Sequence, residues 1–364
     1  MPRVLFVLPR LDAGGAERVV LLLLEHLPRV TFELHLAVTN REGPLLSRLP
    51  LDIQLHDLAA VRVRSALLTL RRLIEDLQPD VIVSELAHVS LALLLLRPVL
   101  PRATRVVVHE HTTLSTQRDI PYRWIRHVAY RLLYRRADLI VCCSRAVAAD
   151  LERRFGLPTQ LLRVVGNPVD EPEIERSRAM PSPFVGPGPH IVGLGRMAFE
   201  KGFDRLIDAF SRVLPRRPAA QLWLLGDGPQ RGILAETART RGLGDRVHIQ
   251  GHCDNPFPWL WHADVLVQAS RREGLPLAVL EAMACKTRIV AFDCPGGTSE
   301  ILRNSTGTVL VPDGDVVEMA DALERFTRAD APRPLGLPQE FRLAAVVGHF
   351  ADALEHVSVV QHPR

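Results

Sequence analysis

The sequence predicts an α/β protein of two domains, each with a mostly parallel β-sheet covered by helices. A length of 364 residues suggests two domains of ordinary size. Short apolar runs alternate with helical patterns from end to end, which is typical of parallel sheets. A stretch rich in Pro, Gly and Arg at 171–189 interrupts this alternation and marks the boundary between the domains.

Five apolar runs in the first half predict buried strands, with helical patterns between them. They are Val4–Leu8, Glu33–Val38, Asp80–Val83, Arg105–His109 and Leu139–Cys142. Alternation restarts after the boundary with Ile191–Gly195, Gln221–Leu225, Val247–Gln250, Val265–Gln268 and Arg288–Ala291. The predicted domains are 1–168 and 169–340, and the apolar pattern of 341–364 predicts a helix that packs back on the first domain. Parallel sheets bind ligands at the carboxyl ends of their strands.

The bulk composition is that of an ordinary globular protein. The chain is 47% hydrophobic and 24% charged, and its longest apolar run, Leu91–Leu96, is far shorter than a membrane span. Five cysteines without a C-x-x-C pair favour free thiols in a reducing cytosol. The net charge of +4 suits phosphate-bearing substrates or an anionic membrane face. Lys201 and Lys286 are the only lysines, which draws attention to Lys201.

The stretch Ser270–Glu281 carries two glutamates eight residues apart. Pro276 fits the first turn of a helix, so Glu273 is expected in the preceding loop and Glu281 inside the helix. Helix N–H groups and two carboxylates would then face one space, which is what a sugar diphosphate requires. The alternative is a capped, solvated helix with two surface glutamates.

The motif Glu-x7-Glu within E-G-L-P-L-A-V-L-E-A-M-A resembles the signature of the retaining glycosyltransferases of family 4. These enzymes have the GT-B fold, in which two Rossmann-like domains face each other across a cleft. The resemblance implies that Glu273 contacts the donor sugar and Glu281 the ribose of the nucleotide. The helix N-terminus at Leu277 would contribute to donor binding. The family resemblance covers most of the chain, from about residue 4 to 330.

The segment Pro9–Arg18 holds Gly14-Gly15 between a predicted strand and a helix expected at Val19–Leu27. Adjacent glycines allow close backbone approach, and the helix offers free N–H groups. A plain strand-to-helix turn is the alternative. The family resemblance implies that Gly14 and Gly15 lie against the donor phosphates and near the acceptor.

Gly193–Gly202 reads G-L-G-R-M-A-F-E-K-G, and its first six residues match a dinucleotide-binding pattern. That interpretation is disfavoured because the helical pattern begins only at about Phe203. The arrangement instead resembles the family's diphosphate clamp, in which Arg196 and Lys201 would neutralise the departing diphosphate. Two solvated surface cations are the alternative.

Three turns complete the predicted second domain. Gly226 opens G-D-G-P, a weak signal that resembles the family's turn near the nucleobase. Asp293–Ile301 resembles its glycine-rich turn near the phosphates. Asp313-Gly314-Asp315 is formally a metal-binding D-x-D, but it is interpreted as a turn and helix cap before Val316–Phe326. The family needs no metal for donor binding, so no metal and no cofactor besides the nucleotide sugar are predicted.

His109 and His111 flank Glu110 directly after a predicted strand. Residues two apart on a strand point to the same face, as metal-ligating histidines often do, but no third ligand with suitable spacing follows. The resemblance points to His111 as the residue near the donor sugar, with His109 as the runner-up. A hydrogen-bonded structural histidine is the alternative.

The segment Tyr122–Arg136 mixes Arg with Trp, Tyr and Leu at helical spacing. This pattern suits a helix at anionic lipid headgroups, and no nucleic-acid-binding fold accompanies it. An amphipathic helix packed on its own sheet with a solvated Arg face is equally compatible with this pattern.

The chain departs from the family at Lys286, which stands where glycine normally takes a left-handed conformation. This departure suggests a changed helix end.

The residues and the resemblance together predict a retaining, metal-independent glycosyltransferase. It would move a hexose or N-acetylhexosamine from a nucleotide sugar, with UDP as the expected nucleotide, to a lipid-linked or cell-surface glycan. The predicted location is cytoplasmic, with peripheral contact at the inner face of the membrane. A nucleotide-sugar epimerase of the same fold and a non-catalytic sugar-nucleotide-binding partner are the alternatives. The donor sugar, the linkage and the oligomeric state are not predicted.

Overall fold

The chain forms two compact units in the computed structural model, which describes residues 1–60, 63–116 and 122–359. Unit 1 combines Met1–Pro168 with the chain from Leu343 onward, and unit 2 is Val169–Arg342. The boundaries expected from the sequence lie after residues 168 and 340. Residues 360–364 of the predicted terminal segment lie outside the described residues.

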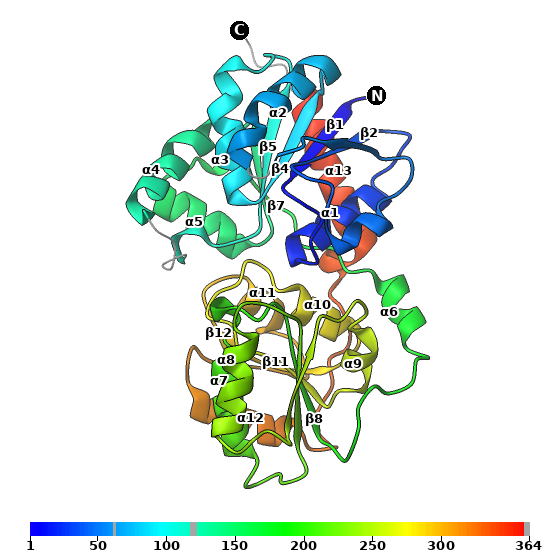
Figure 1. Cartoon of the computed structure of the whole chain (residues 1–364), viewed down its shortest axis with the longest axis vertical. Helices are drawn as coiled ribbons and strands as arrows, with labels where there is room; N and C mark the ends of the chain where they lie inside the picture. The colour runs from blue at the N-terminus through cyan, green and yellow to red at the C-terminus, as the bar shows by residue number, and fades with distance from the viewer. Residues whose placement is uncertain (61–62, 117–121, 360–364) are drawn as a thin grey trace. The chain divides into compact units, whose positions relative to one another are not determined.

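Unit 1 contains a seven-stranded parallel sheet in the order β3-β2-β1-β4-β5-β6-β7 (Figure 1). Its strands are β1 Arg3–Leu8, β2 Glu33–Val38, β3 Gln54–Asp57, β4 Val81–Glu85, β5 Arg105–Glu110, β6 Leu139–Cys142 and β7 Leu162–Val164. Its α-helices are α1 Gly15–His26, α2 Val63–Leu77, α3 Ala87–Leu96, α4 Arg123–Leu133, α5 Arg145–Phe155 and α13 Leu343–Val359.

Unit 2 contains a six-stranded parallel sheet in the order β10-β9-β8-β11-β12-β13. Its strands are β8 His190–Leu194, β9 Gln221–Leu225, β10 Val247–Gly251, β11 Val265–Gln268, β12 Arg288–Asp293 and β13 Thr308–Pro312. Its helices are α6 Glu171–Ser177, α7 Phe203–Val213, α8 Arg231–Thr240, α9 Phe257–His262, α10 Leu277–Ala284, α11 Thr298–Leu302 and α12 Val316–Phe326. The predicted class, α/β with two parallel sheets, is confirmed.

Several elements differ from the sequence-based expectation. Strands β3, β7 and β13 were not predicted, and each lies at an edge of its sheet. Helix α1 begins at Gly15, four residues before the expected start, because its first turn carries polar residues that interrupt the apolar pattern. Helix α7 begins at Phe203 as expected. The predicted cap is also confirmed, because the Asp315 carboxylate accepts hydrogen bonds from two N–H groups in the first turn of α12.

The sheets are buried between helices, as their continuous apolar strands require. In unit 2, Phe210 of α7 and Met319 of α12 belong to one core cluster with Val267 of β11, and all three are at most 1% exposed. Burying a large apolar side chain stabilises a fold by about 1.5–3 kcal/mol. In unit 1, Phe350 of α13 stacks on Phe6 of β1 at a centroid distance of 6.2 Å.

Two chain connections between the units run next to each other. Val169 and Arg342 form a parallel bridge, and the Arg342 guanidinium lies 3.7 Å from the carboxylate of Glu171. The chain therefore enters and leaves unit 2 at one place, and α13 completes unit 1. Among the described residues no helix combines the length and apolar composition needed to cross a bilayer.

The changed end expected for helix α10 is not found, because Lys286 adopts the left-handed conformation that glycine usually takes at this position. Lys286 follows the helix with a φ of +55°, in the left-handed region. The N–H of Thr287 donates to the carbonyl of Ala282 at 2.9 Å, which closes the helix end. A side chain with a Cβ adopts this conformation at a cost of about 1 kcal/mol.

Candidate active site

The predicted donor-binding residues of unit 2 lie in four loops that follow β8, β9, β11 and β12. Loops at the carboxyl ends of parallel strands meet at the same edge of a sheet. Two pairs of these loops are interlocked through glycines whose positive φ and missing Cβ permit close contact.

The first interlocked pair joins the loops after β8 and β9. Gly226 has a φ of +129°, and a Cβ on it would lie 2.0 Å from the carbonyl oxygen of Gly195. The N–H of Met197 donates to the carbonyl of Asp227 at 2.8 Å. The G-D-G-P turn, weak as a sequence signal, is therefore a support for the loop that carries Arg196.

The second pair joins the loops after β11 and β12. Gly296 has a φ of +130°, and a Cβ there would lie only 1.7 Å from the carbonyl oxygen of Glu273. The N–H of Glu273 donates to the carbonyl of Pro295 at 3.0 Å, and that of Gly297 donates to Gly274 at 2.8 Å. The glycine-rich turn that was predicted to lie near phosphates directly holds the backbone of Glu273.

The Glu273 carboxylate collects three donors on one oxygen. Its Oε1 lies 2.7 Å from Nζ of Lys201, accepts from Oγ of Ser270 at 2.6 Å, and accepts from the amide of Gln268. The Glu273 side chain is 9% exposed, and that of Lys201 is 27% exposed. The structure thus joins two residues that the sequence separates by 72 positions.

The second predicted cation is placed differently. Arg196 pairs with Glu200 at 2.5 Å, and its side chain is 67% exposed. Lys201 is therefore the cation held against Glu273, while Arg196 is held at the surface by its own loop.

Helix α10 carries the other two predicted residues of this group. Pro276 is its N-cap with extended backbone, and Leu277 is its first residue, next to the N–H groups at the helix start. Glu281 lies in the same helix and is 3% exposed. The alternative of two surface glutamates is wrong, because both Glu273 and Glu281 are largely withdrawn from solvent.

In unit 1, Gly14 is the N-cap of α1 and Gly15 its first residue. The Glu17 side chain folds back over this turn, so a Cβ on Gly14 would lie 2.3 Å from Glu17 Oε2. Burial raises the pKa of the Glu17 carboxyl, and His111 opposes the rise. Sequence reasoning did not single out Glu17.

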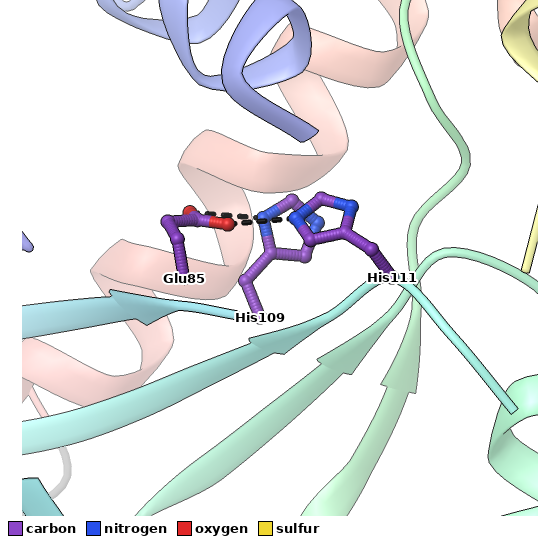
Figure 2. A group of neighbouring side chains, drawn as sticks. All are labelled: Glu85, His109 and His111. Carbon is purple, nitrogen blue, oxygen red and sulfur yellow. Dashed lines mark hydrogen bonds and ion pairs between the residues drawn. The ribbon is translucent and has the colours of Figure 1, made fainter. Parts of the chain in front are cut away.

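The two predicted histidines of unit 1 converge on a third residue, Glu85 (Figure 2). Glu85 ends β4 and is registered with His109 on β5, so their side chains share a face of the sheet. Nδ1 of His109 lies 3.1 Å from Glu85 Oε1, and Nε2 of His111 lies 2.7 Å from Oε2. Burial alone would raise the pKa of the Glu85 carboxyl, but His109 and His111 together lower it to about 2.

The opposite face of β5 holds a second buried carboxylate. Glu110 accepts hydrogen bonds from the hydroxyl of Tyr134 at 2.8 Å and from Oγ1 of Thr112 at 3.0 Å. Burial raises the pKa of Glu110, and the Tyr134 hydrogen bond opposes the rise. Strand alternation separates Glu110 from the two histidines that flank it in sequence.

Glu85, His109 and His111 are also the residue types that bind divalent metals, and their candidate ligand atoms lie within 4.8 Å of one another. Glu85 precedes the two histidines by 24 and 26 residues, so no local spacing in the sequence marks it as a third ligand. Glu85 could have been identified as a candidate site residue because it is a charged residue at the carboxyl end of a predicted strand. The direct contacts of 2.7 and 3.1 Å fit hydrogen bonds between imidazole and carboxylate.

Helix α4 carries the basic aromatic segment, and part of its apolar surface faces solvent. Trp124, Val128 and Leu132 are 72%, 46% and 60% exposed. Their spacing of four residues places them on one side of the helix. Tyr130 and Tyr134 are buried, whereas Tyr122 is 73% exposed, so the segment packs inward with two of its tyrosines and exposes an apolar stripe.

Comparison with known proteins identifies both halves of the chain. Residues 13–172 match the model of "Glycosyltransferase Family 4", and residues 188–328 match that of "Glycosyl transferases group 1". An uncharacterized glycosyltransferase from Methanocaldococcus jannaschii is 26% identical over 64% of this chain and 60% of its own length. The chain spans three fifths or less of the length of several curated relatives that it matches.

One relative aligns over most of its length. The N-acetylgalactosamine-N,N'-diacetylbacillosaminyl-diphospho-undecaprenol 4-alpha-N-acetylgalactosaminyltransferase of Campylobacter jejuni is 25% identical over 89% of both chains. Among solved structures, Anabaena HepE in complex with UDP and glucose superposes with a TM-score of 0.77. That match is 17% identical and covers 98% of this chain and all of the other, so it shows a shared fold.

Proposed function

This chain belongs to the glycosyltransferases of group 1 and family 4, and we propose that it transfers a hexose or N-acetylhexosamine from a UDP-linked donor to a lipid-linked or cell-surface glycan. A structure of the same fold holds UDP and glucose, which supports the choice of donor. The Campylobacter relative is named for a diphospho-undecaprenol acceptor, which supports a lipid-linked one.

The observation that carries the proposal is the contact between Lys201 and Glu273 at the carboxyl edge of the unit 2 sheet. When the bond between sugar and phosphate breaks, the bonding electron pair goes to the diphosphate oxygen and positive charge builds on the sugar. A cation beside a carboxylate provides a partner for each of these charges. Lys201 would stabilise the diphosphate, and Glu273 would orient the sugar hydroxyls.

The remaining predicted residues take roles around this pair. Arg196 would leave Glu200 to bind the diphosphate, Leu277 would offer the N-terminus of α10, and Glu281 would accept hydrogen bonds from the ribose. Gly226 supports the loop of Arg196, in the region proposed for the nucleobase.

Unit 1 would supply groups for the sugar and the acceptor. His111 would contact the donor sugar, and Gly14 and Gly15 would lie near the phosphates and the acceptor. We propose that the reaction retains the configuration at the anomeric carbon, with no carboxylate as nucleophile and no metal ion. Proton NMR of the first-formed product would distinguish retention from inversion.

Calorimetric titration with UDP, GDP and ADP tests the donor assignment. We expect one nucleotide, UDP, to bind, and we expect Lys201→Ala to weaken that binding by about tenfold or more through loss of a phosphate contact. Glu281→Ala should weaken it through loss of the ribose contact. Lys286→Ala is the matched control, because Lys286 is the other lysine of the chain and is exposed at the far end of α10.

Binding of none of the three nucleotides would reject the donor assignment. Equal weakening by Lys201→Ala and Lys286→Ala would show that only net charge matters. If UDP binds, turnover of UDP-glucose and UDP-N-acetylglucosamine with a polyprenyl-diphosphate-linked glycan tests the transfer itself.

We also propose peripheral contact with an anionic membrane from the cytoplasmic side. The exposed stripe of Trp124, Val128 and Leu132 supports it, because exposed Arg123 and Arg131 lie on the same helix. Vesicles containing anionic phospholipid should shift the fluorescence of Trp124, and vesicles of neutral phospholipid should not. Trp124→Ala with Leu132→Ser should abolish sedimentation with the anionic vesicles.

A further inference from the structure

Three buried side chains at the carboxyl ends of β4 and β5 form a set in which only His111 has a role in the proposed donor site. Glu85 lies between His109 and His111, and each of its oxygens takes one ring nitrogen (Figure 2). The side chains of Glu85, His109 and His111 are 0%, 1% and 8% exposed. His111 is therefore the member that retains access to a ligand.

The carboxylate determines which ring nitrogens carry protons. Glu85 is ionised at neutral pH and can only accept hydrogen bonds, so each histidine must donate to it. In neutral His111 the proton therefore resides on Nε2, 2.7 Å from Glu85 Oε2, and Nδ1 is left as an acceptor. Among the described residues, Glu85 is the hydrogen-bond partner of His111 Nε2, so this carboxylate selects the tautomer.

His109 has a different part in the set. Its Nε2 is buried and has no hydrogen-bond partner among the described residues, and its ring packs 5.2 Å from that of Phe350. A second proton would place an unpaired N–H donor and a positive charge in these surroundings. His109 therefore donates its Nδ1 proton to Glu85, and its buried Nε2 is withdrawn from any ligand, which leaves His111 as the member of the set that can contact one.

We propose that Glu85 is a positioning residue for sugar transfer, which holds His111 in the Nε2-protonated tautomer and leaves Nδ1 available to the donor sugar. The sugar substrate in this inference rests on the function proposed above. In this tautomer Nδ1 of His111 accepts a hydrogen bond from a sugar hydroxyl. The other charges that act on His111 are Glu17 on α1 and Glu110 across β5, while α13 contributes the uncharged ring of Phe350.

Nitrogen NMR of the histidine rings tests the tautomer without any substrate. The full chain labelled at its 14 histidines would be compared with His111→Ala and His109→Ala to assign the signals. We expect the Nε2–H tautomer for His111 in the wild type and its loss in Glu85→Gln, since the Gln amide can donate where Glu85 accepts. An Nδ1–H tautomer in the wild type would overturn the proposal.

Kinetics with the UDP-sugar that the wild type turns over test the consequence. In Glu85→Gln we expect kcat to fall about 100-fold while KM stays within about threefold, and Glu85→Asp to recover part of the loss. The pH profile of kcat should also change in Glu85→Gln, because a negative charge next to the proposed donor-sugar contact is removed.

Glu110→Gln is the matched control, because Glu110 is equally buried at the end of β5 but faces Tyr134. If both variants lose activity in proportion to a lower Tm, with unmoved pH profiles, Glu85 is only structural and the proposal fails. Stoichiometric zinc in the purified protein, absent from Glu85→Gln, would also overturn it, because the ring nitrogens would then be ligands. If no UDP-sugar is turned over, the proposed function fails, and the NMR measurement alone decides the assignment of Glu85.

Discussion

The carboxylates of Glu273 and Glu85 lie at the carboxyl edges of two different parallel sheets, and they are held in different ways. Glu273 belongs to a loop, and its backbone is fixed by Gly296 and Pro295 of the neighbouring loop. Glu85 belongs to a strand, and the register of β4 with β5 sets it beside His109. A loop carboxylate needs a second loop to position it, whereas a strand carboxylate needs only the sheet.

The donors also differ. Glu273 accepts from a lysine, an amide and a hydroxyl on one oxygen, while Glu85 accepts from one histidine on each oxygen. The first arrangement pairs the carboxylate with an ammonium group. The second pairs it with two imidazole rings, each of which donates through one nitrogen and leaves the other nitrogen for a different partner.

The largest effect should come from removing the Glu273 charge. We expect Glu273→Gln to lower transfer about 1,000-fold, because a charge-assisted contact made at the reacting sugar is lost. Turnover of the UDP-sugar is the measurement. Ser270→Ala is the control, since it removes one donor to Glu273 and leaves the charge. Comparable rates for wild type and Glu273→Gln would contradict the assigned role.

The loop support of Glu273 can be broken without touching its side chain. We expect Gly296→Ala to lower the free energy of unfolding by about 2–4 kcal/mol, because the new Cβ would meet the Glu273 carbonyl and φ is +130°. Urea unfolding measures the change. Gly232→Ala is the matched control, because a Cβ there meets nothing within 4 Å. A neutral Gly296→Ala would mean that the two loops separate easily.

The contribution of Glu85 to the free energy of unfolding should decrease at acidic pH. The folded-state pKa of Glu85 lies near 2, below its ordinary value of 4.5, so its stabilisation is full above pH 4.5 and is lost as pH falls toward 2. The size of the shift corresponds to about 3 kcal/mol. Unfolding free energies measured from pH 5 to pH 3 should fall more steeply in the wild type than in Glu85→Gln. Parallel slopes would contradict the ionised assignment.

The smallest expected effect concerns the helix that follows Glu273. Lys286→Gly should raise the free energy of unfolding by about 0.5–1 kcal/mol, because Lys286 sits in the left-handed region with a φ of +55°. Thermal unfolding is the measurement. Lys286→Ala separates the charge from the conformation, since it keeps the Cβ and should not be stabilising.

The sequence was sufficient for the central strands and for the continuous motif of Glu273, because both are patterns of adjacent residues. It missed β3, β7 and β13, which lie at sheet edges and lack the fully buried apolar run of a central strand. It identified His111 but not Glu85, because the two residues are 26 positions apart and meet only where the neighbouring strands β4 and β5 end. It predicted that Arg196 and Lys201 both neutralise the diphosphate, and in the structure Arg196 pairs with Glu200 of its own loop.

Helix α13 makes the completion of unit 1 depend on the order in which the chain is synthesised. Unit 1 contains the first residues of the chain and also α13, whose Phe350 covers both Phe6 and His109. During synthesis from the N-terminus, the sheet of unit 1 emerges first and must wait for all of Val169–Arg342 before its last helix arrives. Unit 2 is continuous and can fold as soon as it is made. The histidine pair of unit 1 therefore reaches its final surroundings only after Val169–Arg342 has been synthesised.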